Sequence, residues 1–332
     1  VISPAVSVKA KEAASGYSVE LGSAIWDDES HTTFKYPHVK ITGNANQKIY
    51  SITVDVENGS ASKLEAADVE IPTFGGKGTT YVYDNGKSLA EIEEILKNLQ
   101  FTSTSADKKN VDITISSNKT SGFTRDNIVS MLYNPANGHY YLRTGKLASW
   151  FDSYNTAKTY TFNGRKGYLA TYVYNDAEYQ FLKNTNFFQQ YAVVGASKLK
   201  NTSDGSIISD VDSIAAGSFT TATEPSTTGI YYNCGPEAGE VYNPAGIIAG
   251  QGDDNWECIV IGFGAPGTYD CRNYHQLGYE LIVEFGGYEE KGKKDPGGYE
   301  VTNETRVSDS DFTPYDTEAM IGSERYAPLG AA

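Results

Sequence analysis

Hydrophobic and polar residues alternate in four short segments of the first third of the chain: residues 39–42, 49–56, 79–83 and 111–115. A period of two places every second side chain on the same face, as in a half-buried β-strand. Turn-forming residues separate the segments, at 43–44, 58–59 and 84–86. Short strands at such spacing predict a β-sandwich over residues 19–117.

One segment in this region has the period of a helix instead. Ser88 and Glu91 have the spacing of a capping box, in which each side chain satisfies a backbone N–H group at the start of a helix. Apolar residues then recur at helical spacing, at Leu89, Ile92, Leu96 and Leu99. We therefore expect a helix that begins after Ser88 and buries one face.

The order of strand, capped helix and strand resembles the Ig-like or cadherin-like repeats of large bacterial surface adhesins. The resemblance implies that the helix closes one end of the sandwich. Residues 1–18, which precede it, are rich in Ala, Ser and Lys, and Val6 and Val8 alternate with polar residues. This pattern predicts an N-terminal arm, either flexible or added to the sandwich as an edge strand.

A different pattern begins at Gly167. Residues 171–174 are β-branched and aromatic, which favours a buried strand. Asn175 and Glu178 then have the spacing of a helix N-cap and its N3 acid. Apolar residues follow at helical spacing, at Ala177, Phe181 and Leu182. This stretch predicts a strand that turns directly into a short helix.

The sequence G-Y-L-A-T at 167–171, followed by this helix, resembles the centre of a C-type lectin-like domain. Further motifs resemble those of the family and follow in its order: N-G-H-Y-Y at 137–141, a helix from Trp150, V-V-G-A-S at 193–197, G-P-E-A-G at 235–239, W-E-C-I-V-I at 256–261 and G-Y-E-L-I-V-E-F at 278–285. The resemblance implies an α+β lectin-like domain over residues 137–288, after a connector at 118–136. The apolar faces of its elements predict a core of Trp150, Leu169, Phe181, Val194, Ile282 and Phe285.

The net charge of the chain limits the classes of molecule that we expect it to bind. The net charge of the 332-residue chain is −15, with a pI of about 4.7. Such a chain repels nucleic acid and anionic membranes, so we expect neither as a partner. No run of 18 apolar residues is present, so no membrane span is expected. Residues 289–332 contain ten acidic and five basic residues and the sequence Pro-Gly-Gly, which predicts an acidic tail or an assembly segment.

The three cysteines indicate in which cellular compartment we expect the protein. Cys258 and Cys271 match two positions that are usually bridged in the lectin-like family, and Cys234 is left over. The resemblance therefore implies a disulfide between Cys258 and Cys271, in a protein that is secreted or displayed on the cell surface. The alternative is that both are buried thiols.

Sugar-binding members of the family hold a calcium ion with a loop of sequence E-P-N or Q-P-D, a Glu before the next strand, and an N-D pair after a Trp. By this resemblance, the calcium ligands here are Asp253, Asp254, Glu257 and Asp270. The ligand-binding surface consists of Gln251, Asp253, Asp254, Trp256 and Tyr269. Two departures weigh against such a site, because Gly252 replaces the proline and Tyr269 replaces the Asn. The alternative is a solvated acidic loop.

No H-E-x-x-H, G-x-S-x-G or P-loop motif is present, so we do not expect an enzyme. The resemblances imply an extracellular adhesin that presents a loop surface to a glycan or protein ligand on another surface. The alternative is a structural subunit of a surface filament or layer, joined to other copies of itself, in which the sugar site is vestigial.

Overall fold

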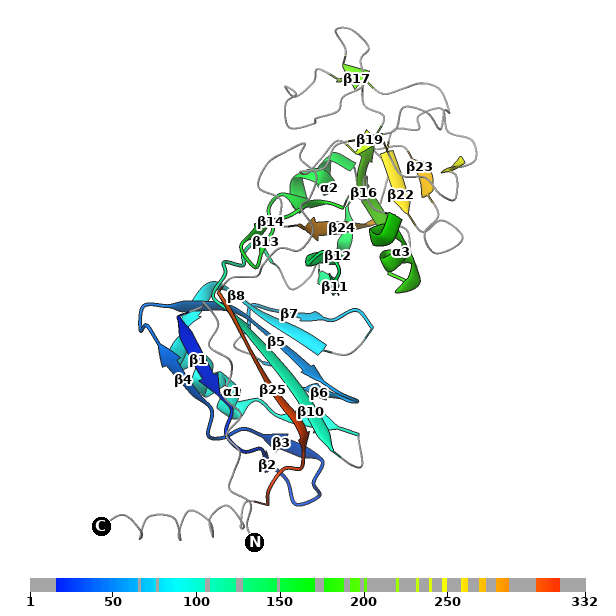
Figure 1. Cartoon of the computed structure of the whole chain (residues 1–332). Coiled ribbons are helices and arrows are strands. Elements are labelled where there is room, and N and C mark those ends of the chain that lie inside the picture. The colour runs from blue at the N-terminus through cyan, green and yellow to red at the C-terminus, as the bar shows by residue number, and fades with distance from the viewer. Residues whose placement is uncertain are drawn as a thin grey trace, which may run out of the picture. The chain divides into compact units, whose positions relative to one another are not determined.

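The computed structural model describes residues 16–286 and 303–316, except for these positions: 65–66, 76–77, 105–107, 124–127, 148–149, 171–175, 188–191, 198–199, 202–218, 221–230, 233–238, 241–246, 250–257, 262–268 and 273–278. The protein is mainly β, with several antiparallel sheets, as the sequence predicted. It divides into two compact units, Val1–Thr120 with Val301–Ala332, and Ser121–Glu300 (Figure 1). In the described residues, no helix is long and apolar enough to cross a membrane.

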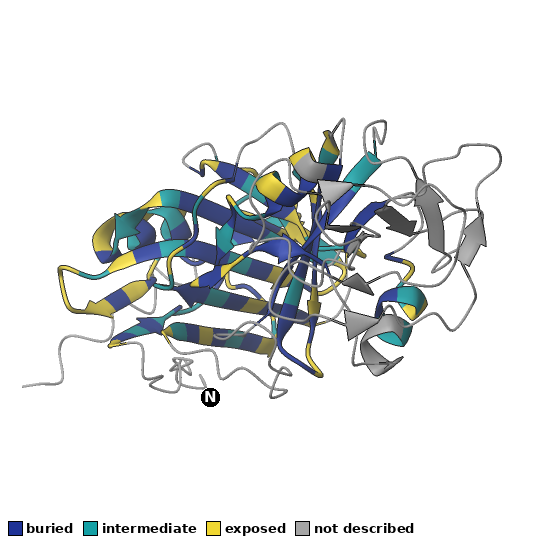
Figure 2. Ribbon diagram, turned by 90° about the horizontal axis from the view of Figure 1, so that it is seen from above, coloured by how far each residue is buried: buried dark blue, intermediate teal, exposed yellow. Residues whose placement is uncertain are grey.

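The larger sheet of the first unit has five antiparallel strands. In spatial order they are β25 (Glu304–Phe312), β10 (Lys109–Ser116), β5 (Lys48–Val56), β8 (Gly78–Ser88) and β7 (Val69–Pro72). Buried and more exposed residues alternate along β10 and β25, as Figure 2 shows, whereas residues 80–83 of β8 are all buried. Val54, Ile113 and Val307 lie side by side on neighbouring strands and are all buried. The period-two pattern therefore predicts the buried face of β10, but not that of β8.

The smaller sheet contains four strands, β2 (Ile25–Trp26), β3 (Thr33–Lys35), β9 (Phe101–Ser103) and β6 (Gly59–Ala61). A separate pair is formed by β1 (Tyr17–Glu20) and β4 (Lys40–Gly43). Phe34 of β3 stacks on Phe101 of β9, with ring centroids 5.5 Å apart. Both belong to the same hydrophobic core as Val54 and Ile113 of the larger sheet.

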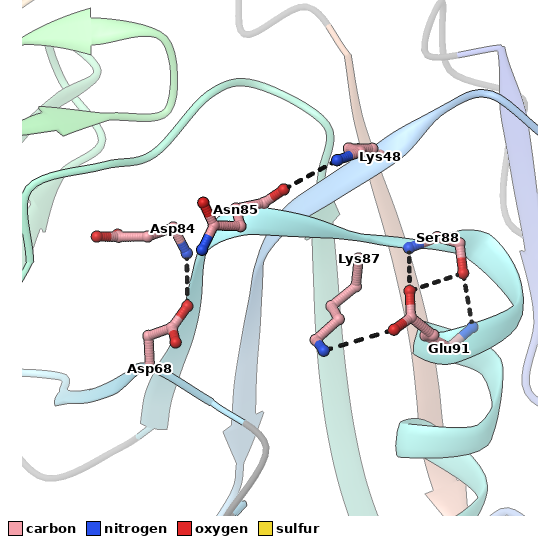
Figure 3. Close-up of polar contacts among 7 residues, drawn as sticks. All are labelled: Lys48, Asp68, Asp84, Asn85, Lys87, Ser88 and Glu91. Atoms are coloured by element: carbon pink, nitrogen blue, oxygen red, sulfur yellow. Dashed lines mark hydrogen bonds and ion pairs between the residues drawn. The ribbon is translucent and has the colours of Figure 1, made fainter.

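The predicted capped helix is present as α1 (Leu89–Asn98). Figure 3 shows its capping box: the Ser88 hydroxyl accepts from the Glu91 N–H, and the Glu91 carboxylate accepts from the Ser88 N–H at 2.8 Å. The predicted apolar stripe is buried. The Glu93 carboxylate also accepts from the N–H of Ile41 in β4, at 2.8 Å, so α1 is bonded to the strand beside it.

The expected turn at residues 84–86 is wrong, because β8 continues through it to Ser88. The strand bulges there: Val82 pairs with Ser51, and the next pair is Lys87 with Ile49. Gly86 has a positive φ of 68°, which allows the irregular backbone. Asp68 accepts from the N–H of Asp84 and Lys48 donates to the carbonyl of Asn85, so the bulge keeps its hydrogen bonds (Figure 3).

The C-terminal region differs from the acidic tail expected at 289–332, because residues Glu304–Phe312 form β25 of the larger sheet. Beyond it, Trp26 N–H donates to the carbonyl of Tyr315, and Tyr315 N–H donates to the carbonyl of Ala24. The ring of Phe312 lies 5.5 Å from that of Phe34. This short segment therefore contacts both sheets of the first unit. The possible edge strand around Val6 lies outside the described residues.

The second unit is built on a ten-stranded sheet with two helices, α2 (Trp150–Ala157) and α3 (Asp176–Asn184). Its main path runs through β11 (Ile128–Asn134), β12 (His139–Leu147), β24 (Tyr279–Phe285), β16 (Ala192–Ser197), β22 (Cys258–Ile261), β23 (Tyr269–Arg272) and β21 (Ile247–Ala249). Three short strands pair beside this path: β15 (Tyr168–Leu169), β19 (Tyr231–Tyr232) and β20 (Gly239–Glu240). Two further pairs are β13 (Thr161–Phe162) with β14 (Arg165–Lys166), and β17 (Lys200–Asn201) with β18 (Phe219–Thr220).

Five of the six predicted core residues are fully buried: Trp150, Leu169, Val194, Ile282 and Phe285. The sixth, Phe181, is only half-buried, whereas the next residue, Leu182, is fully buried. The sequence pattern predicted that Phe181 and Leu182 both lie on the apolar face of α3. In the structure, Leu182 is the one that packs into the core. The expected strand at 171–174 lies outside the described residues.

Candidate functional site

The structure describes the strands that frame the predicted ligand loop, and not the loop itself. β22 and β23 are antiparallel neighbours in the sheet of the second unit. Gln251, Asp253, Asp254, Trp256 and Glu257 lie outside the described residues, directly before β22. Of the predicted calcium site, the structure therefore describes only the neighbouring strands β22 and β23.

Tyr269 and Asp270 are the predicted site residues that belong to a described strand, β23. Asp270 lies opposite Val260, whereas Arg272 lies opposite Cys258, the first residue of β22. Asp270 is thus two residues, or about 7 Å, away from the point where the predicted loop enters β22. The register puts Arg272 rather than Asp270 at that point.

The two cysteines of the predicted disulfide lie on these neighbouring strands. Cys271 of β23 is opposite Ile259, so it is one position out of register with Cys258 of β22. The side chains of both, and the whole of Cys234, lie outside the described part of the chain. The disulfide stays a prediction.

A buried histidine–glutamate pair joins the first and last strands of the predicted lectin-like domain. His139 Nδ1 of β12 lies 2.7 Å from Glu284 Oε1 of β24, and the two side chains are 2% and 0% exposed. The N–H of His139 donates to Asn137 Oδ1 at 3.0 Å. Because water is excluded here, the hydrogen bond between the two side chains is strong, and removing either partner is costly. The pair favours this alignment of the two strands.

A second charged contact on the same strands reaches the end of α3. Arg143 of β12 donates from Nε to Glu280 Oε2 of β24 at 3.0 Å, and from Nη1 to the carbonyl of Phe187 at 3.2 Å. The guanidinium also lies 5.8 Å from the centre of the Phe187 ring. Arg143 therefore holds the chain that leaves α3 against the sheet.

Hydrogen bonds connect α2 with two strands of the sheet. Trp150 Nε1 of α2 donates to the carbonyl of Val194 in β16 at 3.1 Å. Ala170 N–H donates to the carbonyl of Ile282, and Gly195 N–H donates to the carbonyl of Ala170, both at 2.9 Å. These bonds tie α2, β24 and β16 together.

The end of β24 is packed so closely that it requires glycine. A Cβ atom added at Gly286 would lie 2.4 Å from the hydroxyl oxygen of Tyr168 and 3.1 Å from the ring of His139. Arg165 donates to the carbonyls of Phe285 and Gly138 nearby. The side chains of His139, Arg165 and Tyr168 therefore pack closely around the end of β24.

These described groups provide structural contacts and do not form a metal centre. Within the described ranges, no three His, Cys, Asp or Glu side chains come together as ligands of one ion. The predicted calcium ligands are not among the side chains so searched.

Comparison with known proteins gives no relative: no protein-family model, curated protein or solved structure matches the chain.

Four side chains on β12 and β24 were not singled out from the sequence: His139, Arg143, Glu280 and Glu284. One signal was available, because Glu280 and Glu284 are acids within an otherwise apolar strand, Y-E-L-I-V-E-F. A carboxylate in a buried strand needs a cationic or hydrogen-bonding partner.

Proposed function

We propose that the protein is an extracellular adhesin, in which an Ig-like or cadherin-like β-sandwich carries a C-type lectin-like domain. The order of elements in the second unit carries this proposal. A first strand, a helix that opens with Trp150, a second helix, and strands β16, β22 and β24 follow one another where the sequence resemblance expects them. The first and last of these strands pair with each other, from Tyr140–Phe285 to Leu147–Tyr279.

The first unit supports the other half of the proposal. Its two sheets contribute to one core, and α1 begins with the capping box that the resemblance to adhesin repeats includes. Such a unit acts as a spacer that holds a binding domain away from the surface to which the protein is attached.

The C-terminal segment favours an adhesin over a filament subunit. β25 pairs with β10 of its own chain, from Lys109–Phe312 to Ser116–Glu304. A filament built by strand addition needs such a strand to come from a neighbouring copy. The seated β25 supports a first unit that is complete in a single chain.

The ligand in this proposal is a glycan or a protein on another surface, bound by the loops around β22 and β23. Two features make direct calcium coordination of sugar hydroxyls the less favoured mode. Gly252 replaces the family's proline, and the register brings Arg272 to the end of β22. Aromatic contact through Trp256 and Tyr269 is the favoured mode, since such rings commonly dominate binding surfaces.

Binding assays on immobilised ligands test the proposal. The purified chain would be applied to mannan, galactan, mucin, collagen and fibronectin surfaces, each with calcium and with EDTA. We expect retention on at least one surface, and a loss of roughly tenfold or more in affinity for Trp256→Ala and Tyr269→Ala. Tyr315→Ala, an exposed tyrosine of the first unit, is the matched control. No retention on any surface, or equal loss with all three variants, would overturn the proposal.

A further inference from the structure

Two segments of the first unit that are far apart in the chain run side by side in the same direction. The N-terminal segment extends from Tyr17 of β1 to Ile25 of β2, and the C-terminal segment from Thr305 of β25 to Tyr315. Thr305 Oγ1 donates to the carbonyl of Tyr17 at 3.4 Å. Tyr315 forms a parallel bridge with Ile25. Because the two segments meet at their first residues and again at their last, they are parallel, as the arrows of β1 and β25 show in Figure 1.

Hydrogen bonds hold both ends of this arrangement. At the first end, the hydroxyl of the buried Tyr17 donates to the carbonyl of Ile115 in β10 at 2.6 Å. At the last end, Tyr315 N–H donates to the carbonyl of Ala24 at 2.9 Å, and the Tyr315 carbonyl accepts from Trp26 N–H at 3.0 Å. Between the two ends, β25 pairs with β10 along its length. The two segments are therefore bonded to β10 and to each other.

The parallel arrangement decides how the first unit responds to tension between the two ends of the chain. Tension draws Tyr17 backwards along the N-terminal segment and Tyr315 forwards along the C-terminal segment, so the segments are pulled in opposite directions along their length. The hydrogen bonds of a sheet lie across its strands. Such a load therefore acts on all of these bonds together, whereas a load that peels one strand away breaks its bonds one at a time.

The second unit is bypassed by this tension. It is inserted after Ser116 of β10 and before Glu304 of β25, and these two residues are paired. The next residues are bonded as well, since Ser117 N–H donates to the carbonyl of Asn303 at 3.0 Å. Direct bonds thus join the two points at which the chain leaves and re-enters the first unit. Tension crosses these bonds, and it does not reach the chain inserted between them until they break.

We propose that the first unit is a force-bearing clamp, in which the N-terminal and C-terminal segments carry tension between the ends of the chain and keep it off the second unit. Forced unfolding is governed by the unfolding rate, so here it depends on the bonds that the load breaks first, those of the two segments. The clamp does not rest on the proposed adhesin function. If both hold, the domain that binds the ligand keeps its fold while the chain that carries it is under tension.

Single-molecule force spectroscopy of the full chain, held by peptide tags at its two ends, tests the order of unfolding. We expect the first step to be the opening of the first unit. Leu182→Ala, in the core of the second unit, should leave the force of this first step unchanged and lower the force of the step that follows. If Leu182→Ala lowers the force of the first step, the second unit is under load from the outset and the proposal is overturned.

A matched pair of tyrosine variants tests which bonds carry the load. The Tyr17 hydroxyl donates to a backbone carbonyl at 2.6 Å, and the Tyr81 hydroxyl donates to the carbonyl of Ser62 at 2.7 Å; both tyrosines are buried. Tyr17→Phe should raise the unfolding rate at constant force by about fivefold. Tyr81→Phe, away from the two segments, should change this rate by less than about twofold. Urea denaturation confirms that both variants fold, and equal unfolding rates of the two under load would overturn the proposal.

Discussion

At the scale of single residues, a buried carboxyl on β25 makes the stability of the first unit depend on pH. Asp309 is buried, and its carboxylate accepts from the Tyr36 hydroxyl at 3.1 Å. Burial raises the pKa of Asp309 above its usual 3.8, and the Tyr36 hydrogen bond lowers the pKa by less. The folded protein therefore holds this proton more tightly than the unfolded chain does. This contribution favours folding below the unfolded pKa and is lost as pH rises through the folded pKa.

We expect Asp309→Asn to stabilise the protein in a pH-dependent way. The amide can still accept from Tyr36, and it has no charge to desolvate. The melting temperature of the variant should match that of the wild type most closely below about pH 4 and exceed it increasingly as the pH rises towards neutrality. Thermal melts across this range measure the difference, with exposed Asp311→Asn as the control. A difference that does not change with pH would contradict the expected pKa shift.

At the buried pair of His139 and Glu284 in the second unit, we expect a substitution to destabilise the protein rather than stabilise it. His139→Phe leaves Glu284, which is 0% exposed, without the imidazole beside it. Leaving a buried polar side chain without its hydrogen-bond partner costs about 1–3 kcal/mol in the free energy of unfolding, and more if the side chain is charged. The double variant His139→Phe/Glu284→Leu should recover part of this loss, because no carboxylate then remains buried. Urea denaturation measures both variants, and a single variant as stable as the wild type would show that the pair contributes nothing.

At the scale of elements, β25 should be as important to the first unit as any strand that precedes it. Val307 is 1% exposed and lies opposite Ile113 of β10. Val307→Ala should lower the free energy of unfolding by about 2 kcal/mol. Arg306→Ala, at the exposed neighbouring position, should change it by less than about 0.5 kcal/mol. If Val307→Ala and Arg306→Ala changed the free energy of unfolding equally in chemical denaturation, β25 would not pack against β10 as described.

The orientation of α3 makes a similar comparison possible within one helix. Leu182 is 0% exposed, and Phe181 is half-buried. Leu182→Ala should cost about 2–5 kcal/mol, as buried leucines do, and Phe181→Ala clearly less. Thermal melts of the two variants decide the point. The reverse order would mean that Phe181, as the sequence predicted, is the residue that faces the core.

At the scale of the whole molecule, the second unit is inserted between two neighbouring strands of the first. β10 ends at Ser116, and β25, which pairs with it, begins at Glu304. The larger sheet is therefore complete only after the entire second unit has been synthesised. Closing so long a connection costs conformational entropy, and the buried residues of β25 offset that cost.

The oxidation state of the cysteines is a property of the intact chain, and it bears on the proposed extracellular location. We expect non-reduced protein to show one bridge, between Cys258 and Cys271, with Cys234 free. A bridge over a loop of this length contributes about 3 kcal/mol in the chain-entropy model. Intact-mass analysis after alkylation without reductant counts the free thiols. Three labelled cysteines would rule out the bridge and remove one support for an extracellular location.

Local chemistry in the sequence was sufficient for many of the elements. The alternation at 111–115 predicted the strand β10 and its buried face, because a strand buries every second residue. The alternation at 49–56 predicted the strand β5, but Ile49 and Ser51 are buried and Tyr50 is only half-buried, because β5 pairs irregularly with β8 there. Ser88 and Glu91 predicted the start of α1, because a capping box is formed entirely within one helical turn. Each of these signals depends on residues a few positions apart.

The tertiary structure decided what depends on residues far apart in the chain. Glu304–Phe312 resembles a polar tail by composition, and it becomes a strand because β10 offers it hydrogen bonds and a place for Val307. Residues 84–86 resemble a turn, and they become a bulge because β5 continues beside them. Leu182 rather than Phe181 enters the core because of how α3 packs. The pairing of β12 with β24 likewise brings Glu284 to His139, which no local pattern encodes, since the two are 145 residues apart.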